Sequence, residues 1–153
     1  MLRIVEDDLS GPEIAALLQR HLDGMLENSP PESVYALDLD ALRAPDIRFW
    51  SARAGGALAG CGALRRLDAT HGEIKSMRTA DAFLGRGVGT AILRHILSEA
   101  KTAGLTRLSL ETGPTAGFAA ARRLYERHGF VECGAFARYR ADDPFSRFFT
   151  RDL

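Results

Sequence analysis

The sequence predicts a single α/β domain in which a mixed sheet carries helices on both faces. Its 153 residues are close to the usual size of one compact domain. Strand-like segments form hairpins in the first half of the chain and alternate with helical segments in the second half. No internal repeat, linker or low-complexity tract divides the chain. We therefore expect residues 1–153 to fold as one unit.

The chain begins with a β-prone segment at residues 2–5, which precedes an amphipathic helix. Ser10-Gly-Pro-Glu13 has the pattern of a capping box with proline in the first turn. Apolar side chains then recur at helical spacing over residues 14–25. Asn28-Ser-Pro-Pro31 ends this helix, because paired prolines cannot continue its hydrogen-bond ladder. An irregular segment follows.

The middle of the chain predicts a short helix and three strands. Residues 37–42 favour the helix, and residues 47–54 and 57–67 are apolar strands on either side of Gly55-Gly56. A pair of glycines between two strands is typical of a tight hairpin turn. Residues 71–79 follow as the third strand.

The second half of the chain predicts two helices between extended segments. Gly85-Arg-Gly-Val-Gly89 opens a helix that ends at Gly104, with an apolar face formed by Ile92, Leu93, Ile96, Leu97 and Ala100. A strand at residues 107–112 and a helix at residues 116–128 come next. The remaining predicted elements are a stop at Gly129 and extended segments at 130–133 and 145–151.

Composition excludes several classes of function. The 20 Lys and Arg residues balance the 20 Asp and Glu residues, which argues against a protein that coats nucleic acid or an anionic membrane. No apolar run approaches the ~20 residues that a membrane-spanning helix requires. The first residues lead directly into Glu6-Asp7-Asp8, unlike an export signal, so we expect a cytoplasmic protein.

The two cysteines predict no metal site and no disulfide. Cys61 lies in an apolar strand-like segment and Cys133 follows an apolar pair. Neither has the CxxC or Cys/His spacing of metal ligands. Reduced thiols are the expected state in the cytoplasm.

The glycine-rich segment at residues 85–89 is the most informative motif. A dinucleotide-binding fingerprint needs glycine where this chain has Thr90, and a phosphate-binding P-loop needs Gly-Lys-Ser/Thr where it has Gly87-Val88-Gly89. The remaining pattern places bare backbone N–H groups at the start of a helix, where they suit a pyrophosphate. A plain flexible turn is the alternative for the motif on its own.

Three segments in order resemble the motifs of the GCN5-related N-acetyltransferase (GNAT) superfamily: Glu73–Thr79, Gly85–Gly89 and Ala121–Phe130. The resemblance is strong over residues 46–134, and the whole pattern is similar to small single-domain bacterial acetyltransferases of the YsnE type. It implies an acyl-CoA N-acyltransferase fold with a sheet that splays between two parallel strands. It also implies transfer of acetyl from acetyl-CoA to a small-molecule amine, such as an amino acid or a related metabolite.

The resemblance implies a cofactor site between residues 73–79 and residues 107–112. The backbone near Met77, Arg78 and Thr79 would bind the pantetheine as an added strand would. The pyrophosphate would bind the loop residues Gly85, Arg86, Gly87, Val88, Gly89 and Thr90. Two positions depart from the family pattern, since Leu84 replaces an Arg or Gln and Phe118 replaces a frequent asparagine.

The resemblance also implies which residues carry the chemistry. An alkyl ammonium has a pKa near 10, so about one molecule in a thousand is a free amine at neutral pH and a base is needed. Glu73 is the first candidate for that base, Glu111 is its rival, and His71 is a third. Tyr125 would protonate the leaving thiolate, and the N–H of Met77 would polarise the acetyl carbonyl. No cysteine nucleophile is needed.

Acceptor recognition is assigned by the same resemblance to the first helix, the loop after it and the late strands. Arg78 suits a carboxylate of the acceptor. A non-catalytic acyl-CoA-binding module, an O-acetyltransferase and a transferase for other acyl groups are the alternatives, and a homodimer is one implied assembly. The candidate acceptor residues are His21, Met25, Ser29, Glu32, Tyr35, Arg78, Glu111 and Tyr139.

Overall fold

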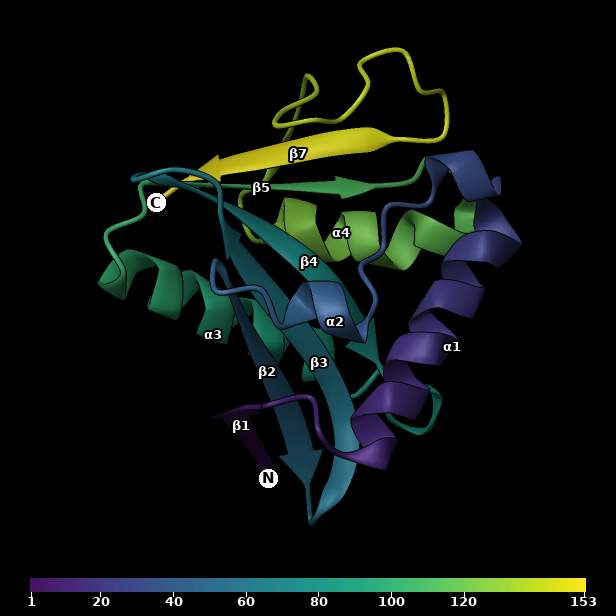
Figure 1. The fold of residues 1–153 in the computed structure, drawn as a ribbon, viewed down its shortest axis with the longest axis vertical. Helices are drawn as coiled ribbons and strands as arrows, with labels where there is room; N and C mark the ends of the chain where they lie inside the picture. Colours follow the sequence, from purple (N-terminus) through teal and green to yellow (C-terminus); the bar gives the residue numbers. More distant parts are fainter.

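The computed structural model describes all 153 residues and contains one seven-stranded sheet in the order β1-β2-β3-β4-β5-β7-β6 (Figure 1). The sheet is mixed, because β4 and β5 are parallel while all other neighbouring strands are antiparallel. This confirms the predicted fold class. The strands are β1 (Leu2–Glu6), β2 (Ile47–Ala54), β3 (Ala57–Arg66), β4 (His71–Thr79), β5 (Arg107–Thr112), β6 (Val131–Cys133) and β7 (Arg147–Asp152).

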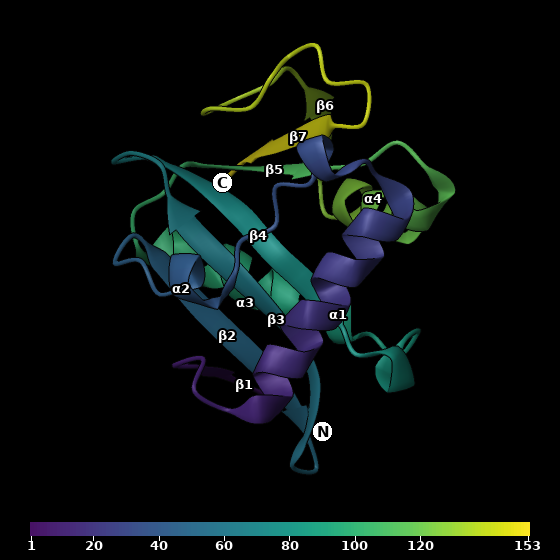
Figure 2. The ribbon, with the colours of Figure 1, turned by 45° about the vertical axis from the view of Figure 1, so that its right-hand side comes forward.

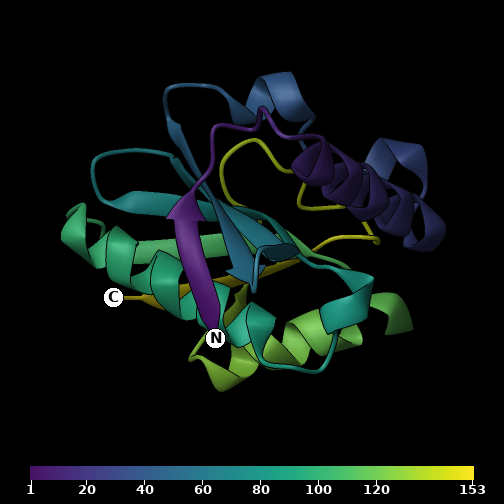
Figure 3. The same ribbon diagram turned by 90° about the horizontal axis from the view of Figure 1, so that it is seen from below.

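Helices cover both faces of the sheet (Figure 3). Helices α1 and α2 lie on one face, and α3 and α4 lie on the other. No helix is long and apolar enough to cross a membrane. The α-helices are α1 (Pro12–Asn28), α2 (Leu39–Leu42), α3 (Val88–Thr102) and α4 (Ala119–Arg127), and the short 3₁₀ turns are η1 (Pro31–Ser33), η2 (Asp81–Phe83) and η3 (Ala116–Phe118).

Each face of the sheet has its own apolar core. Helix α3 contributes Ile92, Leu93 and Ile96 to the larger core, all at most 1% exposed, as its predicted apolar face requires. The smaller core joins Ile14 and Leu18 of α1 to α2 and to the opposite face of β2 and β3. Burial of these side chains is the main force that fixes both helix layers against the sheet.

The start of α1 corrects one prediction. Gly11 is the residue before the helix, and no side chain caps it. The Ser10 hydroxyl instead donates to Asp8 Oδ1 at 2.6 Å, within a local turn. The predicted capping box is therefore wrong, because Gly11, which has no side chain, occupies the N-cap position in place of Ser10. Pro12 does occupy the first turn of the helix, as predicted.

Most other boundaries agree with the sequence. Gly55 and Gly56 have φ values of 56° and 88°, which only glycine adopts readily, and they form the predicted hairpin turn. The predicted helix at residues 116–128 divides into η3 and α4. Both cysteines are free.

Candidate active site

Strands β4 and β5 pair only at their first three residues. His71, Gly72 and Glu73 face Arg107, Leu108 and Ser109, and the two strands then diverge (Figure 2). From Ile74 to Thr79, the edge of β4 that faces β5 has no strand partner. Its backbone N–H and C=O groups can therefore bind an extended ligand as an added strand would. The splayed sheet that the resemblance implied is present.

A β-bulge interrupts β4 within this open segment. Cys61 of β3 pairs with Arg78, but Ala63 pairs with Lys75, so β4 contains an extra residue. Ser76 adopts φ 55°, in the left-handed region, and its carbonyl accepts a hydrogen bond from Cys61 Sγ at 3.3 Å. Burial raises the pKa of the Cys61 thiol to about 12. The thiol therefore stays protonated and holds the bulge rather than serving as a nucleophile.

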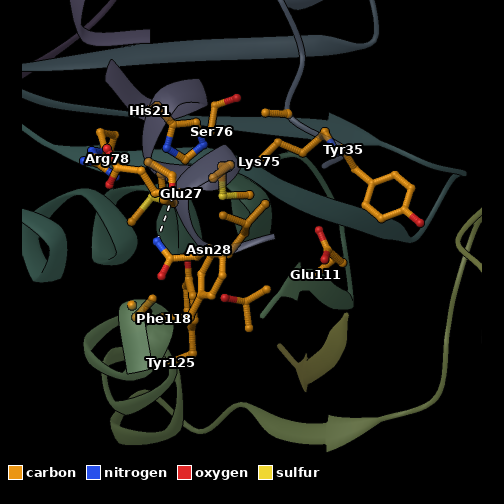
Figure 4. Close-up of a pocket in the computed structure, with 18 of the residues that line it drawn as sticks. His21, Glu27, Asn28, Tyr35, Lys75, Ser76, Arg78, Glu111, Phe118 and Tyr125 are labelled. Atoms are coloured by element: carbon orange, nitrogen blue, oxygen red, sulfur yellow. Dashed lines mark hydrogen bonds between the residues drawn. The ribbon is translucent and has the colours of Figure 1, made fainter. Parts of the chain in front are cut away.

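A cavity of about 340 Å³ opens where the strands separate (Figure 4). We call it the reaction cavity. Helix α1 forms one wall, the open part of β4 and the end of β5 form its floor, and η3 with α4 closes the far side. Its lining includes the predicted residues His21, Met25, Tyr35, Glu73, Met77, Arg78, Glu111, Phe118, Tyr125 and Tyr139.

A buried polar cluster joins β4 to the loop before β7. The Glu73 residue is 2% exposed, and its carboxylate lies 3.3 Å from Lys75 Nζ and accepts a hydrogen bond from the Tyr139 hydroxyl. Lys75 Nζ also donates to the Tyr139 oxygen at 2.8 Å. Burial and the neighbouring Glu73 carboxylate raise the pKa of Tyr139 well above its usual range. Glu73, Lys75 and Tyr139 thus hold one another in place.

Glu111 lies near the end of β5 and lines the same cavity (Figure 4), close enough for the charges of Lys75 and Glu73 to affect its pKa. Burial raises the pKa of its carboxyl to about 7, against the opposing effect of Lys75. A carboxylate with a pKa near neutrality can accept a proton at physiological pH and release it again. The burial of Glu111 therefore supports its role as the base, and the sequence alone could not show this burial.

Tyr125 and Phe118 form the side of the cavity nearest α4 (Figure 4). Tyr125 is 6% exposed, and burial raises the pKa of its phenol well above the usual range. The hydroxyl is thus a proton donor, not a phenolate, at neutral pH. Phe118 packs its ring against Gly113 at the end of β5, so it fills space where an asparagine would offer an amide.

His21 and Ser76 contribute polar atoms that nothing in the protein satisfies. His21 Nδ1 and Ser76 Oγ are both inaccessible to solvent and lack hydrogen-bond partners, and both residues line the cavity. Burial, together with the charges of Arg78 and Lys75, lowers the pKa of His21 to about 4, so its imidazole is neutral. Buried polar atoms without partners are costly, so a local rearrangement that let a polar ligand group reach them would be favourable.

The glycine loop lies beyond the lining of the reaction cavity, at the start of α3. Gly85 and Gly87 have φ values of 73° and 80°, and Gly87 is the residue before the helix. Gly89 lies close to α4, where an added Cβ would be 3.3 Å from a methyl group of Leu124. Leu84 is 62% exposed, and the Arg86 guanidinium lies 5.6 Å from the centre of the Phe83 ring. The first N–H groups of α3 lack helical partners and remain available to an anion.

Asp143 ties the segment after α1 to the loop before β7. Its side chain is buried and accepts hydrogen bonds from Ser33 Oγ at 2.9 Å and the Tyr35 hydroxyl at 2.8 Å. Burial alone would raise the pKa of Asp143, but hydrogen bonds from the Phe145 N–H, Tyr35, Ser33 and Arg140 lower it to about 2. Tyr35 then packs edge-on against Tyr139, with ring centres 5.1 Å apart. We call this group of contacts the Asp143 clamp.

Two predicted acceptor residues lie outside the cavity. Ser29 ends α1 in an extended conformation and Glu32 is exposed in η1, and neither lines the site. The chain turns at Pro30-Pro31, so Ser29 and Glu32 lie outside the cavity lining. The hydrogen bond of Ser33 to Asp143 then holds the following segment against the loop before β7. Sequence reasoning missed Asp143 altogether. No signal marks it, because its partners lie 110 and 108 residues away.

Comparisons with known proteins agree with this geometry. The model of a family described as Acetyltransferase (GNAT) matches residues 14–130. The uncharacterized N-acetyltransferase YedL of Escherichia coli is 54% identical over 153 residues, which cover 100% of this chain and 96% of that protein. YsnE of Bacillus subtilis, described in the same words, is 52% identical over 152 residues and 99% and 100% of the two chains. An IAA acetyltransferase of Azospirillum brasilense is 40% identical over 126 residues, or 81% and 80%.

Solved structures show the same fold. A Klebsiella pneumoniae protein assigned as an acyl-CoA N-acyltransferase superposes with a TM-score of 0.81 at 27% identity, over 100% of this chain and 98% of that one. A GNAT family acetyltransferase from Elizabethkingia anophelis, solved with acetyl-CoA bound, has a TM-score of 0.69 at 18% identity, over 99% and 98% of the chains.

Proposed function

This chain belongs to the GNAT family of acetyltransferases, and on that premise we propose that it transfers acetyl from acetyl-CoA directly to the amine of a small molecule. One observation carries the proposal. The reaction cavity places a carboxyl group with a pKa near neutrality, Glu111, and a protonated phenol, Tyr125, around the gap between β4 and β5. Direct transfer needs a base and an acid of this kind.

The chain offers acetyl-CoA two sets of backbone groups and a polar pocket. The open edge of β4 near Met77, Arg78 and Thr79 suits the pantetheine amides. The loop from Gly85 to Thr90 suits the pyrophosphate. The unsatisfied atoms of His21 and Ser76 would gain partners if a local rearrangement let polar ligand atoms reach them. When bound, acetyl-CoA supplies an electrophilic thioester carbonyl.

We propose that Glu111 takes the proton from the acceptor amine. Glu73 was the first candidate from the sequence, but its carboxylate already binds Lys75 and Tyr139. In the proposed scheme Glu73 holds those two side chains in place, and Lys75 in turn keeps a positive charge near Glu111. The N–H of Met77, next to the bulge, polarises the acetyl carbonyl oxygen. Tyr125 gives its proton to the sulfur as the carbon–sulfur bond breaks.

The names of two relatives favour a small-molecule acceptor. One is an IAA acetyltransferase, and an amino-acid acetyltransferase of Mycobacterium tuberculosis is 38% identical over 77 residues, which cover 50% of this chain and 40% of that protein. The two free cysteines agree with the proposed cytoplasmic location.

Release of CoA thiol in the presence of acetyl-CoA and a panel of amines tests this function. We expect thiol release only with certain amines, at one thiol for each acetylated product measured by mass spectrometry. The same panel should include matched alcohols, which separate N-transfer from O-transfer. Calorimetric binding of acetyl-CoA without turnover on any acceptor would contradict the proposal and favour a non-catalytic binding module.

A further inference from the structure

We propose that the acceptor carries a carboxylate, which binds in a second, basic cavity next to the reaction cavity. The inference rests on the proposed transferase function and adds the chemical class of the acceptor. The second cavity has a volume of about 530 Å³ and lies between the segment after α1, the end of β3 and the loop before β7. We call it the basic cavity. It shares with the reaction cavity the lining residues Tyr35, Ala36, Glu73, Lys75 and Tyr139.

The shared residues make the two cavities neighbours across a thin partition. The rings of Tyr35 and Tyr139 pack edge to face, and Tyr139 reaches Glu73 from the loop side. A molecule that spans this partition would place one end beside Glu111 and the other in the basic cavity. An acceptor with its amine at the first end needs a group of suitable charge at the second.

The charges of the basic cavity favour an anion. Four cationic side chains line it against two acidic ones: Arg65, Arg66, Lys75 and Arg138 against Asp46 and Glu73. Two of the cations are already hydrogen-bonded within the protein, and Arg65 lies within ion-pair distance of Asp46. Lys75 binds Glu73 and Tyr139, and the Arg66 guanidinium donates to backbone carbonyls, the shortest bond being 2.8 Å to Ala103.

Arg65 and Arg138 retain free hydrogen-bonding capacity. Arg65 Nε lies 3.6 Å from Asp46 Oδ2, beyond hydrogen-bond distance, and this buried atom has no hydrogen-bond partner. Arg138 is exposed, lines the cavity, and forms no hydrogen bond or ion pair with the protein. A guanidinium group binds a carboxylate through two parallel N–H donors. An anionic ligand would therefore satisfy Arg65 and give Arg138 a partner.

The remaining walls favour an apolar body between the two polar ends. Leu37, Leu67 and Ala137 line the cavity beside the two tyrosines. Ala137 has φ 51°, in the left-handed region, and the N–H of Tyr139 closes the turn by donating to Phe136 at 3.1 Å. This tight turn brings Arg138 and Tyr139 to the same cavity. The acceptor class is thus an amine joined through a short apolar body to a carboxylate.

Arg78, the carboxylate ligand expected from the sequence, is less suited to that role. Its guanidinium lies against Gly24 of α1, where a Cβ would be only 2.9 Å away, and 3.8 Å from an oxygen of Asp81. The charge of Arg78 is thus already partly balanced by Asp81.

Matched acceptors and arginine variants test the inference. We would measure KM and kcat for 5-aminopentanoate and 5-aminopentanamide, and for 6-aminohexanoate and 6-aminohexanamide, at equal concentrations of free amine. Arg138→Gln and Arg65→Gln should each raise KM for the acids about tenfold, the loss of one charge-assisted interaction, and leave the amides unchanged. Arg138→Lys should restore part of the loss. Arg94→Gln, an exposed arginine on α3, is the control.

The outcomes separate the two proposals. Equal KM values for acid and amide in the wild type, or a response to Arg78→Gln alone, would overturn the basic cavity while leaving the transferase intact. If no amine is acetylated, the transferase proposal fails, and calorimetry with 6-acetamidohexanoate then tests the cavity directly. Binding that weakens about tenfold in Arg138→Gln supports the carboxylate site, and absence of binding rejects it.

Discussion

The cofactor end and the acceptor end of the proposed binding site are built in different ways. At the cofactor end, one continuous stretch from β4 to the start of α3 supplies the open strand edge, the bulge and the glycine loop. At the acceptor end, side chains from α1, β3, β5 and the loop before β7 meet from distant parts of the sequence. The first end presents mainly backbone amides, and the second presents charged and aromatic side chains.

This difference assigns different work to the two ends. Backbone amides along an open strand edge recognise a cofactor whatever side chains the strand carries. The sequence at this end must therefore provide the right backbone conformation, and glycine where φ is positive. Side chains at the acceptor end select one molecule and adjust its proton affinity, so their requirement is identity and burial. Changes at the first end should affect cofactor affinity, and changes at the second should affect chemistry and acceptor use.

The largest expected effect is at Glu111. Glu111→Gln should lower kcat about a hundredfold or more, because the amide cannot accept the proton. In the wild type, kcat/KM for free amine should rise with pH through about 7, as the carboxyl ionises, and then level off. Thiol-release assays quenched at fixed times, run over a range of pH, would measure the loss of kcat and the pH dependence of kcat/KM.

Glu73→Gln is the matched control for this prediction. Because Glu73 is proposed to position Lys75 and Tyr139, its variant should lose less activity and keep the pH step near 7. A pH step that disappears in Glu73→Gln but survives in Glu111→Gln would reverse the two assignments.

The second effect concerns Tyr125, which lies at the border of the two ends. Tyr125→Phe should lower kcat on the order of tenfold to a hundredfold, since the thiolate loses its proton donor but the ring remains. KM for acetyl-CoA and the melting temperature should stay near wild-type values. Tyr35→Phe offers the contrast, because that hydroxyl binds Asp143 and its loss should change KM for the acceptor instead. Wild-type turnover in Tyr125→Phe would remove Tyr125 from the mechanism.

Two glycine substitutions test the cofactor end, one in the glycine loop and one in the hairpin turn, and both place a side chain at a positive φ. Gly87→Ala places a Cβ at φ 80°, and we expect the Kd for CoA to rise about tenfold, the equivalent of the 1–2 kcal/mol that this conformation costs. Gly55→Ala introduces similar strain at φ 56° in the hairpin turn, where a Cβ would meet nothing within 4 Å. It should lower stability without changing CoA affinity. Equal Kd values for CoA in the two variants would contradict the assignment of cofactor binding to the glycine loop.

The smallest effect belongs to the Asp143 clamp. Asp143→Asn should destabilise the fold by about 2 kcal/mol, because the donors of Ser33, Tyr35 and Phe145 lose a buried, charged acceptor. The depressed pKa of Asp143 stabilises the native state above its unfolded value of 3.8, and that contribution is lost as pH falls toward about 2. Denaturant unfolding from pH 5 to pH 2 measures this difference. A wild type and variant with parallel pH dependence would argue against the clamp.

The sequence predicted the cofactor end well because its signals are local. Residues 71–79 and 107–112 were predicted as strands with the observed boundaries, and the glycines at 85 and 87 marked a left-handed loop before a helix. Apolar spacing also predicted α3 and its buried face. Each of these follows from residues within a few positions of one another.

The acceptor end could be predicted only in part. The resemblance indicated His21, Glu111 and Tyr139, all of which line the cavity, but also Ser29 and Glu32, which do not. The contact of Lys75 with Tyr139, the burial that raises the pKa of Glu111 and the role of Asp143 all depend on long-range packing. No local pattern reports which loop will cover a strand or how much solvent it excludes.

Amide hydrogen exchange with and without CoA tests the central claim most directly, because the claim assigns cofactor binding to backbone N–H groups. CoA should slow exchange in β4 from Ile74 to Thr79 and in the loop from Gly85 to Thr90, and leave the β2–β3 hairpin unchanged. Binding of CoA without protection of either segment would contradict the account.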